Sequence, residues 1–267
     1  MKNMLVCIKQ VPDTTEIKID PVKKTLIRDG VPSIINHDDK AGIEAALQLR
    51  ESLNDGSTVT VVCMGPPQAD VALREALAMG CDEAYLLSAR EFGGSDTFAT
   101  SQIISAAITH LGLGEEDIIF CGRQAIDGDT AQVGPQIAEN LGIPQVSYAE
   151  EVSIAGDVVT VKRQYEDRYH IIDVKTPCLL TALAELAEPR YMHAGLIIDA
   201  YEKDITVMGF EDLKDSINPD HIGLMGSPTR VVTSFGKMPK GAGTILNVDA
   251  DEAVKAIIAK MEERHII

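Results

Sequence analysis

Residues 121–130 contain the residue types that a phosphate or nucleotide site requires. This run, CGRQAIDGDT, holds two glycines and one arginine and leads into a helical pattern that starts at Thr130. Glycines let a backbone approach a ligand closely, and the free N–H groups at a helix start bind phosphate. The sequence has neither a P-loop nor a G-x-G-x-x-G dinucleotide fingerprint. The residues alone leave open a second interpretation, in which Asp129 or Thr130 is an ordinary N-cap and Gly128 an ordinary turn.

Three further loops are expected at the same site. They are residues 7–10, 36–39 and 63–66. In an open parallel sheet, ligands bind in the crevice outside the carboxyl ends of the strands, so the loops that follow strands are the first candidates. The sequence therefore predicts a site where these three loops and residues 121–130 meet.

The cysteines and histidines form no catalytic or metal-binding pattern. The five cysteines are widely spaced without a C-x-x-C pair, which argues against a disulfide framework or a zinc site and favours a reducing cytoplasm. We interpret them as small buried hydrophobic residues. The six histidines lack H-E-x-x-H or similar spacing. Neither residue type indicates a nucleophile or a metal centre.

Alternating strands and helices must position these loops. The strand patterns cover residues 4–8, 59–64, 84–88 and 117–121, and the helical patterns cover residues 39–53, 69–79, 97–111 and 132–141. Strands that are apolar throughout, each followed by a helix, are typical of a parallel sheet covered on both faces. The sequence predicts an α/β fold with a doubly wound, mostly parallel, Rossmann-like sheet.

The pattern changes after residue 150. Residues 158–161 and 169–174 are predicted to form an antiparallel hairpin, and residues 179–183 the last strand of the core. Residues 184–200 have no clean period and are predicted to form an exposed loop.

The C-terminal part has a lower apolar density. Residues 201–240 are predicted to form an extended arm and residues 249–264 a short amphipathic helix. We therefore divide the chain into a nucleotide-binding α/β domain, residues 1–200, and a C-terminal arm and helix, residues 201–267, which pack on a partner.

The charge balance limits the classes of partner. Lysine and arginine number 24 against 41 aspartate and glutamate residues, which gives a formal net charge of −17. Such a surface repels nucleic acid and anionic lipid, so we expect the chain to bind neither nucleic acid nor membrane. The apolar run near the N-terminus is too short for a signal peptide or a membrane span, which favours a cytoplasmic location.

Three runs of sequence resemble the beta subunit of electron-transfer flavoproteins. They are VCIKQVPDT at residues 6–14, CMGPP at residues 63–67 and GRQAIDGDTAQVGP at residues 122–135. Residues 76–82 and 188–191 also match, so the resemblance spans nearly the whole chain. It implies a heterodimer in which an alpha subunit carries a redox-active FAD and the beta subunit holds an adenine nucleotide.

The family includes two kinds of beta subunit. Most hold AMP, whereas some anaerobic members hold a second FAD, take a hydride from NADH there and split the electron pair. One electron goes to ferredoxin or flavodoxin, and the other passes through the alpha flavin to an acyl-CoA dehydrogenase or related flavoenzyme. Residues 9–14 and 127–135 resemble this bifurcating branch. The resemblance thus implies FAD, with AMP as the alternative, NADH as substrate and no catalytic acid or base.

The resemblance also assigns nucleotide contacts, residue by residue. These fall on Cys7, Asn36, Asp39, Cys63, Arg123, Gln124, Ala125, Asp127, Gly128, Asp129, Thr130, Ala131, Gln132, Val133 and Gly134. Two positions depart from the family pattern. Ala194, followed by Gly195, stands where the family presents a protruding apolar side chain to the dehydrogenase, and Gln164 stands where a glutamate is usual.

Two other functions stay open. A beta subunit with structural AMP would serve as scaffold and docking platform of a non-bifurcating electron carrier. A stand-alone adenine-nucleotide-binding protein, such as an ATP-dependent transferase, would need no partner. The predicted arm of residues 201–267 argues against this last possibility, because it needs a surface on which to pack.

Overall fold

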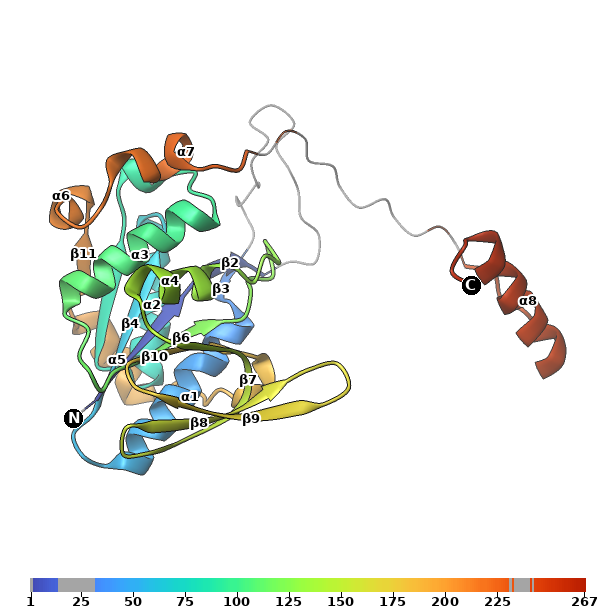
Figure 1. Ribbon diagram of the computed structural model, residues 1–267, viewed down its shortest axis with the longest axis horizontal. Helices are drawn as coiled ribbons and strands as arrows, with labels where there is room; N and C mark the ends of the chain where they lie inside the picture. Colours follow the sequence, from blue (N-terminus) through green and yellow to red (C-terminus); the bar gives the residue numbers. More distant parts are fainter. Residues whose placement is uncertain (1, 14–31, 231, 233–240, 242) are drawn as a thin grey trace. The chain divides into compact units, whose positions relative to one another are not determined.

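The computed structural model describes residues 2–13, 32–230, 232, 241 and 243–267 (Figure 1). The chain divides into two compact units, one that ends at Val232 and a smaller one that contains Thr233–Ile267. The described part of the smaller unit has one helix, α8 (Ala250–Glu263). Its N-cap residue Asp249 accepts a hydrogen bond from the Glu252 N–H, which satisfies one of the free donors at the helix start.

The core of the first unit is a mostly parallel sheet. Its nine described strands are β1 (Asn3–Ile8), β4 (Thr58–Met64), β5 (Glu83–Leu87), β6 (Ile118–Gly122), β7 (Gln145–Ala155), β8 (Val158–Gln164), β9 (Tyr169–Lys175), β10 (Cys178–Ala182) and β11 (Thr206–Met208). They lie in the order β11-β5-β4-β1-β6-β10-β7-β8-β9. Pairing is parallel from β11 to β7, and β8 and β9 extend the sheet by antiparallel pairing.

Helices cover both faces of this sheet (Figure 1). The longer ones are α1 (His37–Leu53), α2 (Asp70–Met79), α3 (Thr97–Leu111), α4 (Val133–Leu141) and α5 (Ala194–Glu202). Side chains of α1, α2 and α5 belong to one buried apolar cluster, and those of α3 and α4 to a second one. All residues of the central strand β10 are buried. The predicted doubly wound α/β fold is therefore confirmed.

The prediction of an exposed loop over residues 184–200 is wrong. The structure has a 3-10 turn at Ala184–Leu186 and then the helix α5, which packs against α2 and buries Ala200. A helix this short with a single buried residue has no clear amphipathic period. Tertiary contact stabilises it, which sequence periodicity does not report.

Residues 201–230 also differ from the expected arm, whereas residues 231 and 233–240 of that arm lie outside the described residues. Strand β11 pairs in parallel with β5 at the far edge of the sheet, and Leu213 and Ile222 are buried in the second cluster. Residues 179–183 are therefore not the last strand of the core. The first compact unit also continues past the expected boundary after residue 200. A strand of three residues carries too little pattern for recognition.

Three smaller differences concern the element ends. Residues Gln10–Pro12 (β2) form a strand, paired with Ser33–Ile35 (β3), where a loop was expected. Strand β7 was not predicted, because its second half alternates between half-buried and exposed residues. Helix α4 begins at Val133 after the N-cap Gln132, one residue later than the predicted helical pattern of residues 132–141, so neither Asp129 nor Thr130 caps it. In the described part of the chain, every helix is too short or too polar to cross a membrane.

Candidate functional site

The ends of β1 and β6 form the crevice where the sequence predicts a ligand. These strands are neighbours in the sheet, but the helices that follow them, α1 and α4, belong to different apolar clusters and so cover opposite faces. The strand order reverses at this point, and the loops after the two strands separate from one another. Such a switch point is the usual ligand position in open α/β sheets.

Asp39 joins the two strand ends. Its Oδ2 accepts a hydrogen bond from the Lys9 N–H at 2.7 Å, and its Oδ1 accepts one from the Gly122 N–H at 2.9 Å. A Cβ atom at Gly122 would lie 2.1 Å from the Asp39 Oδ1, so only glycine permits this approach. Burial raises the pKa of Asp39 to about 7, although both N–H bonds oppose the shift.

Asn36 and Lys9 hold the loop that follows β6. The Asn36 Nδ2 donates to the Gln124 carbonyl at 2.8 Å, and its Oδ1 accepts from the Ile126 N–H at 3.1 Å. The Lys9 Nζ lies 2.6 Å from the Asp127 Oδ1. The side chains of Asn36 and Asp39 therefore hydrogen bond to the backbone of the chain, and these bonds position the loop.

The end of this loop has the features of an anion site. Asp129 and Ala131 have φ angles of 44° and 52°, in the left-handed region that costs energy for residues other than glycine. The backbone N–H groups of residues 130–134 have no hydrogen-bond partner within the described part of the chain. They lead into the first turn of α4, where such groups attract phosphate.

Arg123 is the cation closest in sequence to this anion site. Its Nε lies 3.5 Å from the Asp38 Oδ2 but makes no hydrogen bond in the described structure. Burial raises the pKa of Asp38, and the Arg123 charge opposes this shift. Arg123 therefore has a buried Nε donor that the described part of the chain leaves without a hydrogen bond.

The two cysteines assigned by the resemblance lie inside the sheet beneath this loop. Cys7 pairs with Cys121 across β1 and β6, and Cys63 pairs with Ile8 across β4 and β1. All five cysteines of the chain are free and buried, as predicted. Burial raises the pKa of Cys63 to about 12, which makes a reactive thiolate unfavourable. Cys7 and Cys63 are thus part of the buried sheet.

A cavity of about 710 Å³ opens beside the loop, and Lys9 is part of its lining. Its walls come from the residues after β1, β4 and β5, namely Lys9, Gln10, Met64, Gly65, Pro66, Pro67, Ala69, Leu87, Ser88, Ala89, Arg90, Phe92, Gly93, Gly94 and Ser95. The wall formed by residues 87–95 is absent from the predicted site. Its signal was the Gly93-Gly94 pair that follows a strand, the same feature that singled out residues 121–130.

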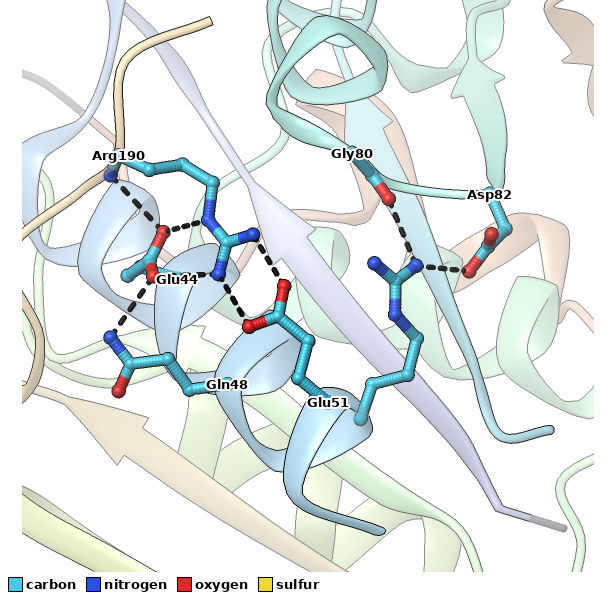
Figure 2. Close-up of polar contacts among 7 residues, drawn as sticks. Glu44, Gln48, Glu51, Gly80, Asp82 and Arg190 are labelled. Atoms are coloured by element: carbon cyan, nitrogen blue, oxygen red, sulfur yellow. Dashed lines mark hydrogen bonds and ion pairs between the residues drawn. The ribbon is translucent and has the colours of Figure 1, made fainter. Parts of the chain in front are cut away.

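Arg190 fixes the segment that leads to α5 (Figure 2). Its guanidinium hydrogen bonds to both carboxylates of Glu44 and Glu51 on α1, at distances of 2.5 to 3.2 Å. The next residue, Tyr191, is 99% exposed. Ala194 is the first residue of α5.

The second departure from the family pattern, Gln164, lies at the end of β8. It is exposed and pairs with Tyr169 on β9. Its neighbour Arg163 stacks on the rings of Tyr148 and Tyr165. Gln164 thus lies apart from the residues that form the crevice.

Comparison with known proteins identifies the family of this chain. The family model described as electron transfer flavoprotein domain matches residues 23–212. The electron transfer flavoprotein subunit beta of Clostridium acetobutylicum is 53% identical over 265 residues, covering 99% of this chain and 100% of that protein. The acryloyl-CoA reductase electron transfer subunit gamma of Anaerotignum propionicum is 53% identical, with 98% of both chains covered. Subunit CarD of the caffeyl-CoA reductase-Etf complex of Acetobacterium woodii is 51% identical, with 99% of both covered. The chain therefore belongs to the electron transfer flavoprotein family, as a beta subunit.

Proposed function

We propose that this beta subunit binds FAD and, with an alpha subunit, passes electrons from NADH to ferredoxin or flavodoxin and to an acyl-CoA dehydrogenase-type flavoenzyme. The cavity of about 710 Å³ beside the loop after β6 carries this proposal. A mononucleotide needs only the loop, whereas the flavin half of FAD needs the additional space. The relatives named after acryloyl-CoA and caffeyl-CoA reductases support the same function.

The residues of the crevice fit an adenine nucleotide. The free N–H groups of residues 130–134 and the guanidinium of Arg123 would bind its phosphates. Lys9 neutralises Asp127, so this carboxylate does not repel them. FAD supplies the redox chemistry when bound, and the chain binds it, orients it and excludes water.

Two exposed apolar surfaces would bind the protein partners. We assign the first, around α5, to the acyl-CoA dehydrogenase-type flavoenzyme, and the second, on α8, to the alpha subunit. The first consists of Tyr191, Met192, Ile198 and Tyr201, and the second of Val254, Ile257 and Ile258. Large apolar side chains left in contact with water favour burial against another protein. The free cysteines suit a cytoplasmic location for the assembly.

AMP is the second candidate for the site. The N–H groups that would bind phosphate belong to the loop and to α4, and none of these residues lines the cavity. The loop would therefore hold AMP equally well. In that case, the chain would act as a scaffold for an electron carrier with a single flavin.

An anaerobic assay of the heterodimer tests the electron path. We expect NADH oxidation to require both ferredoxin and the dehydrogenase-type partner, because the two electrons of a hydride leave by different routes. Lys9→Met should slow this reaction, since it leaves Asp127 without its cation in the crevice. Lys214→Met, which removes an exposed ion pair with Glu211, is the control. Equally fast oxidation with the dehydrogenase as sole acceptor would contradict bifurcation.

A further inference from the structure

One wall of the cavity has little regular structure of its own. It is formed by residues 87–95, of which Leu87 ends β5 and only Arg90–Phe92 of the others form a 3-10 turn. Gly93 and Gly94 follow, and Gly94 has a φ of 76°. Glycine restricts the backbone less than any other residue. This wall therefore needs contacts from another part of the chain to keep a single conformation.

Residues 221–229, which we name the strap, supply these contacts. The Leu224 N–H donates to the Gly93 carbonyl at 3.0 Å. A Cβ atom at Gly223 would lie 2.3 Å from the Glu91 carbonyl oxygen, so the two backbones approach too closely for any other residue. The short helix of the strap, α7 (Gly223–Gly226), packs against α3 and against the 3-10 turn of the wall (Figure 1).

Asp96, the residue directly after the wall, connects it to the strap. The Asp96 N–H donates to the buried Ser227 Oγ at 2.8 Å, and this hydroxyl donates to the Gly223 carbonyl at 2.7 Å. The Asp96 Oδ1 caps α3 by accepting from the Ala99 N–H at 3.0 Å. Its Oδ2 accepts from the Thr229 N–H at 2.9 Å and from the Thr229 hydroxyl. One carboxylate oxygen thus caps α3, and the other binds the strap.

We propose that Asp96 is a positioning residue of the cavity, which holds the wall in its ligand-binding conformation through Thr229 and Ser227. The strap ends just before Val232, the last residue of the first compact unit. Only the identity of the ligand, NADH, rests on the proposed function.

Asp96→Asn separates the two tasks of this side chain. Asparagine is an equally good N-cap, but its amide nitrogen cannot accept hydrogen bonds from Thr229. In the heterodimer we expect KM for NADH to rise about tenfold, the size of one lost charge-assisted contact, with little change in kcat. Backbone amides of residues 93–95 should exchange hydrogen faster. Thr229→Val removes only the hydroxyl. It should raise KM for NADH and the exchange rate of these amides as well, but by less.

Asp55→Asn is the matched control, because Asp55 likewise accepts hydrogen bonds from both the N–H and the hydroxyl of one residue, Ser57, and lies before β4 at the opposite end of the sheet. An unchanged KM together with unchanged amide exchange in Asp96→Asn would overturn the proposal. A lower melting temperature with unchanged KM would do the same, because it would show a purely structural role. The exchange measurement needs no ligand. If the heterodimer binds no NADH but Asp96→Asn still speeds amide exchange, the result would support the role of Asp96 in holding the wall. It would at the same time refute the proposed function.

Discussion

Arg190→Leu is expected to lower the free energy of unfolding by about 3 kcal/mol, as measured by urea denaturation. The side chain of Glu44 is 4% exposed, and its carboxylate accepts hydrogen bonds from the Arg190 Nε at 2.8 Å and Nη2 at 3.0 Å. These bonds hold the pKa of Glu44 below its usual value although burial acts in the opposite direction. Removing the guanidinium leaves a buried carboxylate without a cation, and this accounts for the size of the loss.

Arg50→Leu provides the control, since it removes another paired arginine, one that belongs to α1 itself. Arg50 donates to the Gly80 carbonyl at 2.9 Å and to Asp82 at 2.8 Å, and the side chain of Asp82 is 41% exposed. An exposed pair of this kind contributes about 1 kcal/mol or less. Equal losses in the two variants would contradict the role of the buried carboxylate. Combining Arg190→Leu with Glu44→Met should restore much of the stability, because the unpaired charge is then absent.

The stability of the chain should fall with rising pH because of Asp39. Its pKa rises from 3.8 to about 7 in the folded state, so between these values the folded chain binds more protons than the unfolded chain. The contribution of Asp39 is therefore fully present below pH 3.8 and is lost as the pH rises through about 7. Relative to Asp39→Asn, the wild type should lose about 1 kcal/mol of unfolding free energy per pH unit between pH 5 and 7. Parallel pH profiles for the two proteins would contradict this assignment.

Asp117→Asn tests whether Asp39 also maintains the nucleotide site. Asp117 likewise accepts two backbone hydrogen bonds, from the Asn3 N–H and the Gly114 N–H, both at 2.8 Å, but it lies at the opposite end of the sheet. We expect Asp39→Asn to lower the nucleotide content of the purified heterodimer, because the ends of β1 and β6 are no longer joined. Asp117→Asn should leave the nucleotide content unchanged. Equal losses would show that Asp39 affects the site through stability alone.

The sequence predicted most of the sheet because its central strands are apolar throughout and alternate with helices. It failed where tertiary contacts decide the structure. Helix α5 depends on its contact with α2, and β11 is recognisable as a strand through its pairing with β5. Strand β7 extends beyond its parallel partner β10 to pair with β8, so its residues alternate between half-buried and exposed.

The candidate site was only partly accessible from the sequence. Residues 121–130 were identified by their glycines and by the helix that follows them. The hydrogen bonds from Asp39 to Lys9 and Gly122 depend on the order of β1 and β6 in the sheet, which local patterns do not report. The contact between the strap and residues 87–95 likewise joins segments separated by more than a hundred residues. Periodicity carries no information on such pairs.

The cofactor content of the heterodimer tests the central claim most directly. The chain would be coexpressed with its alpha subunit, the purified complex denatured, and the released FAD and AMP counted per heterodimer. The account predicts two FAD and no AMP, because the cavity beside residues 123–134 provides space for a flavin. One FAD with one AMP would contradict FAD binding by this chain. Release of a single FAD and no other nucleotide would contradict the nucleotide site itself.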